Sequence, residues 1–217
     1  MRYRTFLFDL DGTLVDAFTT IHRGYVHTLP QFGLPAPTMA QVRRAVGGGI
    51  KVAMRHFVRE DQLEDAIRVH NDYTQKILLE DVVLMPGALE LLRLLRDRGA
   101  RSAVFTNKNN LAARRVCEHL GITPLVNGVF GAGDTPWLKP QREFTEHVLR
   151  VLNADAATSL LIGDSPFDVQ TARNAGFPCW VVTTGTHAAD ELRVAGAAAV
   201  FPDLPTLQLN LAERTKN

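Results

Sequence analysis

Short apolar runs alternate with segments of helical periodicity over most of the chain. The apolar runs are typical of buried strands, because apolar, aromatic and β-branched residues follow one another between turn-forming residues. They are Thr5–Leu10, Ser102–Thr106, Gly128–Phe130, Ser159–Ile162, Cys179–Thr183 and Ala198–Phe201. Leucines recur at helical spacing between Gly87 and Gly99, and Asn109–Leu120 has a similar pattern that ends at Gly121. This alternation predicts an α/β fold with a doubly wound, mostly parallel sheet.

The segment from Ala17 to about Asp81 departs from that alternation. It contains no convincing strand, and prolines and glycines divide it into at least three helical patterns. The dividing residues are Pro30, Pro35, Pro37 and Gly47–Gly49. We therefore expect residues 17–81 to form an all-helical insertion, and residues 1–16 and 82–217 to form the α/β core.

Charge is distributed unevenly within this helical segment. From Ala17 through Arg59 there are six Lys or Arg and no Asp or Glu, whereas Glu60 through Asp81 holds seven acids against two bases. Such an asymmetry could direct a positive face at an anionic substrate, or each half could simply be a solvated helix face. The sequence leaves both interpretations open.

Acidic residues follow two of the predicted strands. The first strand leads into Asp9-Leu10-Asp11-Gly12, and the strand Ser159–Ile162 leads into Gly163-Asp164. Carboxylates at the end of a buried strand are costly unless a cation or a proton offsets them, and a hard divalent cation such as Mg²⁺ accepts such oxygens. A solvated turn with glycine at a positive φ is the plainer interpretation of the first site.

Two further polar residues occupy equivalent positions. Thr106 ends the second predicted strand, and Lys139 precedes the helical pattern that follows Pro140. Open α/β sheets bind ligands at the carboxyl ends of their strands, so acid pair, hydroxyl, lysine and acid pair are expected at one edge of the sheet.

In order and spacing, these four motifs resemble the haloacid dehalogenase superfamily, in its phosphoglycolate phosphatase-like branch with a helical cap. The resemblance covers nearly the whole chain, and the stretches Phe6–Asp16 and Gly163–Asp168 carry its most specific motifs. It implies a Rossmann-like sheet with an inserted all-helical cap domain, and a Mg²⁺-dependent phosphatase that acts on a small phosphomonoester through an aspartyl-phosphate.

The resemblance also implies roles for individual residues. Asp9 is expected as the nucleophile and Asp11 as the general acid and base. Thr106, Lys139 and the backbone N–H of Asn107, at an expected helix start, would bind the phosphoryl oxygens. Metal ligands would be the carboxylates of Asp9 and Asp164 and the backbone carbonyl of Asp11. Asp168 would cap its helix and hold Lys139 or a metal-bound water, whereas Lys108 matches no phosphate ligand of the family.

Substrate selection is expected in the cap, where the residues are harder to choose. The glycine run opens a helix, and Gly48 in that run, Lys51 and Arg55 are the candidates for contact with substrate.

Composition changes this picture little. The net charge of +1 gives no support to nucleic-acid or membrane binding, and the N-terminal stretch lacks a signal-peptide pattern, so a cytoplasmic location is expected. Cys117 and Cys179 have no metal-ligand spacing and are expected to be buried free thiols. The expected partner is a small anionic phosphorylated metabolite, and the expected assembly is a monomer or a weak homodimer.

Two alternatives share part of the pattern. A β-phosphoglucomutase-like phosphosugar mutase has all four motifs and differs in its cap. A receiver-like signalling domain also combines an acid pair, a threonine and a lysine around an aspartyl-phosphate, but its phosphorylated aspartate lies on a middle strand in a much shorter chain.

Overall fold

The computed structural model describes residues 2–213 and contains a six-stranded parallel sheet in the order β5-β4-β1-β6-β7-β8. The strands are Thr5–Phe8 (β1), Arg101–Asn109 (β4), Val129–Ala132 (β5), Ser159–Gly163 (β6), Cys179–Val182 (β7) and Ala199–Phe201 (β8). Each corresponds to one of the apolar runs in the sequence, so the prediction of a doubly wound α/β sheet is confirmed. Strand β1 lies between β4 and β6 near the middle of the sheet.

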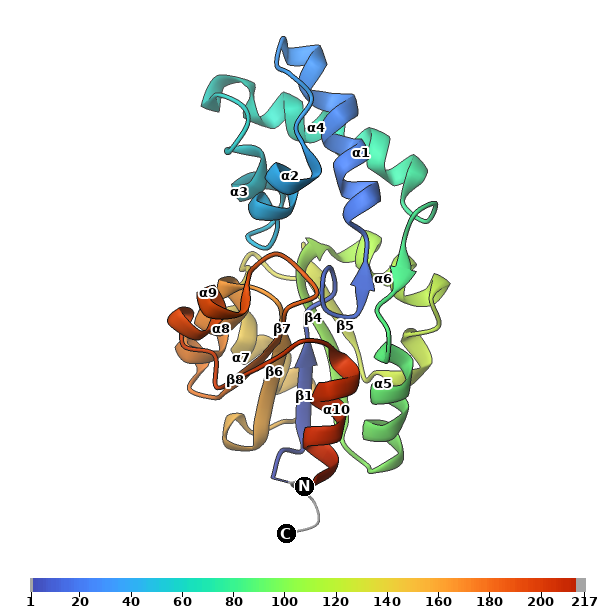
Figure 1. Cartoon of the computed structure of the whole chain (residues 1–217), viewed down its shortest axis with the longest axis vertical. Helices are drawn as coiled ribbons and strands as arrows, with labels where there is room; N and C mark the ends of the chain where they lie inside the picture. Colours follow the sequence, from blue (N-terminus) through green and yellow to red (C-terminus); the bar gives the residue numbers. More distant parts are fainter. Residues whose placement is uncertain (1, 214–217) are drawn as a thin grey trace.

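Alternate residues of the strands face two separate hydrophobic layers. Phe6 and Phe8 pack on one side of β1, and Leu7 packs on the other, as the two-residue period of a strand requires. The first face is covered by Ala88–Asp97 (α5), Asn110–His119 (α6) and Leu204–Glu213 (α10). The second is covered by Arg142–Val151 (α7), Pro166–Ala175 (α8) and Ala189–Ala195 (α9). Helices on both faces bury the central strands completely (Figure 1).

A helical insertion, residues 18–77, stands beyond the carboxyl ends of the strands (Figure 1). It contains Phe18–Thr28 (α1), Met39–Ala45 (α2), Ile50–Met54 (α3) and Leu63–Ile77 (α4), with short 3-10 turns at Leu29–Phe32 and Glu60–Gln62. Two connections join it to the sheet layer, and there Val15–Asp16 (β2) pairs antiparallel with Val83–Leu84 (β3). The insertion has its own core, centred on Tyr25, Val42 and Met54. It is therefore a separately packed layer.

One boundary differs from the expectation. Strand β4 continues through Asn107 to Asn109, and α6 begins at Asn110 with the Asn109 side chain as its N-cap. The expected helix start at Asn107 is therefore wrong. The register between β4 and β5 shifts between Phe105 and Asn109, and this irregularity carries the strand beyond its apolar run.

The charge asymmetry of the insertion is resolved by ion pairs between its two halves. Lys51 pairs with Glu64, Arg55 with Glu60 and Arg59 with Asp61. Arg23 contacts both Glu80 and Asp81. The remaining cations of the first half, Arg43 and Arg44, reach the sheet layer.

Within residues 2–213, no helix combines the length and the apolar character needed to cross a membrane. Cys117 and Cys179 are buried free thiols, as expected.

Gly24→Ala should destabilise the insertion. A Cβ at Gly24 in α1 would lie 2.4 Å from Thr74 Cγ2 and 2.6 Å from His70 Nε2 of α4. The helical preference for alanine is worth about 0.5–1 kcal/mol, whereas overpacking costs about 1–3 kcal/mol. We expect a net loss of about 1 kcal/mol in the free energy of unfolding, measured by urea denaturation. Val26→Ala, at a partly exposed position of the same helix, should change stability by less than about 0.5 kcal/mol. A Gly24→Ala protein as stable as the wild type would contradict the close packing of α1 against α4.

Candidate active site

The carboxyl ends of β1, β4 and β6 bring the predicted polar residues together. Asp9 directly follows β1, Asp164 directly follows β6, and Thr106 and Asn107 lie within β4. Because these strands are neighbours in a parallel sheet, their ends meet at one edge. All four residues are buried, and so are Lys139 and Asp168.

A buried ammonium group lies at the centre of the site. Lys139 Nζ is 2.9 Å from Asp9 Oδ1 and 2.7 Å from Asp168 Oδ1, and the lysine side chain is 1% exposed. The Asn107 side chain holds the backbone of this lysine: Lys139 N donates to Asn107 Oδ1 over 2.8 Å, and Asn107 Nδ2 donates to Lys139 O over 2.9 Å. This amide fixes where the ammonium group stands relative to the end of β1.

Asp164 is held by hydroxyl and backbone donors. Its Oδ2 accepts from Thr186 N at 2.9 Å and from Thr186 Oγ1 at 3.1 Å, and its Oδ1 accepts from Thr13 Oγ1 at 3.3 Å. Gly185 is packed tightly against this carboxylate, because a Cβ there would lie 1.8 Å from Asp164 Oδ2. Only glycine fits this close approach without displacing Asp164.

Asp168 has two sets of contacts. Its Oδ2 accepts from Ser165 N at 3.1 Å, as in the capping box of α8, and also from Ser165 Oγ at 2.6 Å and Asp164 N at 3.2 Å. Its Oδ1 faces Lys139. The same carboxylate therefore begins a helix and orients the buried ammonium group.

The electrostatic balance of the cluster is negative. Oxygen atoms of Asp9, Asp164 and Asp168 lie within 4.8 Å of one another, and Lys139 contacts two of these carboxylates, Asp9 and Asp168. Burial, opposed by Lys139, raises the pKa of Asp9 to about 6. Burial and the neighbouring carboxylates of Asp168 and Asp9 raise the pKa of Asp164 well above its usual value. Burial alone would lower the pKa of Lys139, but Asp168 and Asp9 outweigh it and the net shift is upward. An additional cation would be favoured here.

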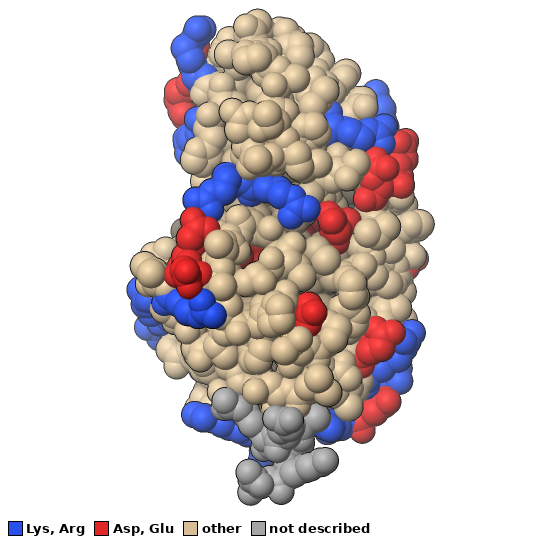
Figure 2. Space-filling model, in the orientation of Figure 1, with Lys and Arg blue, Asp and Glu red and all other residues tan. Residues whose placement is uncertain are grey.

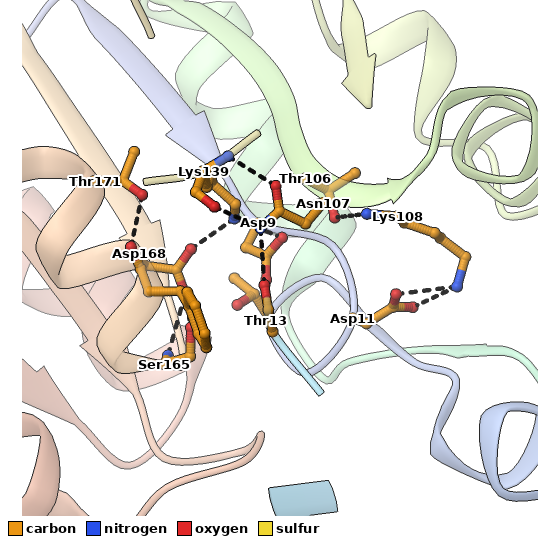
Figure 3. A network of polar contacts seen from close by, with 12 residues as sticks. Asp9, Asp11, Thr13, Thr106, Asn107, Lys108, Lys139, Ser165, Asp168 and Thr171 are labelled. Atoms are coloured by element: carbon orange, nitrogen blue, oxygen red, sulfur yellow. Dashed lines mark hydrogen bonds and ion pairs between the residues drawn. The ribbon is translucent and has the colours of Figure 1, made fainter. Parts of the chain in front are cut away.

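Asp11 stands apart from that cluster. Its side chain points toward Lys108, whose Nζ donates to Asp11 Oδ1 and Oδ2 over 2.9 and 3.0 Å (Figure 3). No role for Lys108 follows from the sequence, and the structure makes it the side-chain partner of Asp11. The sequence shows a lysine two residues beyond Thr106, but its contact with Asp11 follows only from the continuation of β4 to Asn109, which places Lys108 over the loop after β1.

A cavity of about 410 Å³ separates the sheet edge from the helical insertion. Asp9, Asp11, Thr106, Asn107 and Lys108 line its sheet side. Among the three candidates in the insertion, Lys51 lines this cavity, whereas Gly48 and Arg55 do not. Gly48 packs toward Phe167 and Val52 instead, and Arg55 pairs with Glu60.

Several polar contacts between described residues cross from the insertion to the sheet layer. Asn107 Nδ2 donates to Gly47 O over 3.0 Å, Arg43 Nη1 donates to Gly185 O over 3.2 Å, and Arg44 pairs with Glu191 at 2.9 Å. Figure 2 shows basic side chains in a row at the level where the insertion meets the sheet layer. Two of these contacts involve residues that also position Lys139 or Asp164.

The chain belongs to the haloacid dehalogenase-like hydrolase family, whose model matches residues 6–182. It is 34% identical over 207 residues to a phosphoglycolate phosphatase of Rhodobacter capsulatus, with 93% of each chain covered. It is 30% identical over 195 residues to the probable phosphatase IndB of Dickeya dadantii, covering 87% of this chain and 85% of that protein. These matches assign the chain to the phosphoric monoester hydrolases of the family, so the resemblance seen in the sequence is confirmed and the receiver-like alternative is not retained.

Solved structures agree on the fold. The crystal structure of a predicted phosphoglycolate phosphatase from Haemophilus somnus superimposes with a TM-score of 0.89 at 23% identity, covering 98% of this chain and 99% of that one. At this identity the likeness supports the α/β architecture with its helical insertion.

Removing the buried ammonium group should cost considerable stability. In Lys139→Met, Asp9 and Asp168 lose their shared partner, and an uncompensated buried charge costs about 3–5 kcal/mol. We expect a loss of that size in the free energy of unfolding at pH 8 with EDTA, and a smaller loss at pH 5, where the carboxylates take up protons. Lys108→Met is the matched control, since Lys108 is 12% exposed and should cost less than half as much. Equal losses in the two variants would contradict the central role of Lys139.

Proposed function

We propose that this protein hydrolyses a small phosphomonoester through an aspartyl-phosphate on Asp9. The observation that carries the proposal is the position of the Asp9 carboxylate, which lines the cavity while one of its oxygens lies 2.9 Å from the buried ammonium group of Lys139. A nucleophile beside a fixed cation is what transfer of a charged phosphoryl group requires.

The reaction follows in two steps from the chain's own residues. An oxygen of Asp9 attacks phosphorus, the bond from phosphorus to the leaving oxygen breaks, and Asp11 donates a proton to that oxygen. A water molecule then attacks phosphorus, Asp11 takes its proton, and the bond to Asp9 breaks to release phosphate. Thr106, Asn107 and Lys139 bind the phosphoryl oxygens. Asp11 must leave its contact with Lys108, or share it with the leaving oxygen, to carry out these transfers.

The acidic cluster fits a magnesium ion. Three buried carboxylates that face a single lysine leave excess negative charge, and carboxylate oxygens are the ligands that Mg²⁺ prefers. We propose Asp9, Asp164 and the backbone carbonyl of Asp11 as its ligands, with Asp168 acting through Lys139. When bound, the ion would offset charge on the phosphoryl group and orient it.

We also propose that residues 17–81 act as a cap over residues 1–16 and 82–217. The insertion forms one wall of the cavity, and the contacts of Gly47, Arg43 and Arg44 hold it against the sheet layer. The cap would exclude water and select the substrate. The named relatives make 2-phosphoglycolate the first substrate to test. A cytoplasmic location and a monomeric or weakly dimeric state remain predictions.

Asp9→Asn should abolish phosphate release and leave the fold intact. The amide matches the carboxylate in size but is a poor nucleophile, so we expect turnover to fall by at least about 1000-fold. Release of inorganic phosphate from 4-nitrophenyl phosphate with Mg²⁺ measures this, and circular dichroism checks the fold. Asp190→Asn, at a side chain that is 94% exposed, is the control and should keep normal activity. Normal turnover by Asp9→Asn would refute the assignment of the nucleophile. Isomerisation of β-glucose 1-phosphate to glucose 6-phosphate in the presence of a bisphosphate primer, without release of free phosphate, would favour the mutase instead.

Mg²⁺ should stabilise the protein most above pH 6. The folded-state pKa of Asp9 is raised from 3.8 to about 6, so without metal its ionisation removes stability as pH rises through that interval. Below pH 6 a metal ion must displace the proton of Asp9, so the stabilisation by Mg²⁺ decreases. At 100 times its Kd, Mg²⁺ should add about 2.7 kcal/mol at pH 8 relative to EDTA, measured as a shift in Tm.

Asp164→Asn tests the same site independently of catalysis. The variant loses a proposed ligand but also one buried charge, so its Tm in EDTA should equal or exceed that of the wild type, and Mg²⁺ should add little. Wild-type protein that shows no shift in Tm with Mg²⁺ at pH 8 would contradict the proposed metal site.

A further inference from the structure

The cavity between sheet and insertion has mostly apolar walls. Its aliphatic lining comes from both layers and is only partly buried by the protein itself: Ile21, Val46, Ile50, Ala112, Ala132 and Leu138. Ile21, Val46, Ile50 and Ala112 pack against the hydrophobic cores with part of their surface, and the rest of that surface is not buried by the protein. An occupant with an apolar face would cover that surface.

The polar groups of the walls away from Asp9 are mostly neutral. Asn71 and Thr74 of α4 line the cavity on the insertion side, and Asn109 lines it on the sheet side. Such amides and hydroxyls can hydrogen-bond a neutral ligand but cannot balance a carboxylate.

The cations of the lining are already paired. Among the described residues that line the cavity, the basic side chains are Lys51 and Lys108. Lys108 contacts both oxygens of Asp11. Lys51 Nζ lies 2.6 Å from Glu64 Oε1, and the Glu64 side chain is 75% exposed, so this ammonium group lies at the solvent edge. A carboxylate on the leaving group would have to compete with Asp11 for Lys108 or with Glu64 for Lys51 in a largely apolar site, which is costly.

Size points the same way. Cavities of about 300–1000 Å³ enclose ligands of drug size, and this cavity measures about 410 Å³. The leaving group of 2-phosphoglycolate has two carbons and would leave most of the apolar wall uncovered.

We propose that the substrate is a phosphomonoester whose leaving group is neutral and presents an apolar face of about the size of an aromatic ring or larger. This inference rests on the proposed function and narrows it. The phosphoryl group would stand at Asp9, and the neutral group would lie between Ile50 of the insertion and Leu138 of the sheet layer.

Three alkyl phosphates test the substrate class with the Mg²⁺-loaded protein. Benzyl phosphate, 4-carboxybenzyl phosphate and 2-phosphoglycolate all leave as alcohols, so differences report mainly recognition. We expect kcat/KM for benzyl phosphate to exceed both others by at least tenfold. A value for 4-carboxybenzyl phosphate or 2-phosphoglycolate that equals or exceeds it would overturn the inference while the proposed function stands. Absence of phosphate release from these three and from 4-nitrophenyl phosphate would overturn the function itself.

Glu64→Gln tests the argument from paired cations. This substitution frees Lys51, so kcat/KM for 4-carboxybenzyl phosphate should rise about threefold while that for benzyl phosphate stays constant. Glu60→Gln is the matched control, because it makes the same charge change and frees Arg55, which does not line the cavity. Equal ratios of the two kcat/KM values in Glu64→Gln, Glu60→Gln and wild-type protein would contradict the proposal that the pairing of Lys51 excludes anionic leaving groups.

Discussion

The site depends on one buried ammonium group that faces more carboxylates than it can balance. Lys139 contacts Asp9 and Asp168, and Asp164 lies within the same cluster. Burying these charged groups carries a large desolvation penalty, and their mutual attraction offsets that penalty only if the geometry is fixed. Two features of the fold fix this geometry. The Asn107 side chain hydrogen-bonds the backbone of Lys139, and the capping box at the start of α8 orients Asp168. A bound metal ion would neutralise the remaining negative charge.

The same anchors connect the site to the helical insertion. Asn107 Nδ2 donates both to Lys139 O and to Gly47 O, so a single side-chain amide joins the loop that contains Lys139 to the turn Gly47–Gly49 of the insertion. Arg43 donates to the carbonyl of Gly185, which is the residue packed against Asp164. A movement of the insertion would therefore break contacts of residues that position the charged cluster.

Much of this arrangement could be predicted from the sequence, because strand periodicity and acids at strand ends are local signals. All six strands of the parallel sheet were found in this way, and Asp9, Thr106, Lys139 and Asp164 do meet at one edge. The pairing of Lys108 with Asp11 could not, because it joins residues far apart in the sequence and depends on the irregular extension of β4. The expected helix start at Asn107 was wrong because asparagine is a common N-cap and the sequence has three in this stretch, Asn107, Asn109 and Asn110; the irregular extension of β4 makes Asn109 the cap.

The charge asymmetry of the insertion has a structural explanation that the sequence left open. Four basic residues of its first half pair with acids that lie beyond it, three of them within the insertion and one at its junction with β3. Most basic residues of the first half are therefore neutralised in exposed ion pairs, which contribute little to the electrostatic field at the cavity. Under the proposed function, attraction for a phosphate would then come from the sheet edge, where Lys139 lies. The insertion would contribute shape and apolar surface instead, so the sheet edge would bind the phosphoryl group and the insertion would discriminate among the groups attached to it.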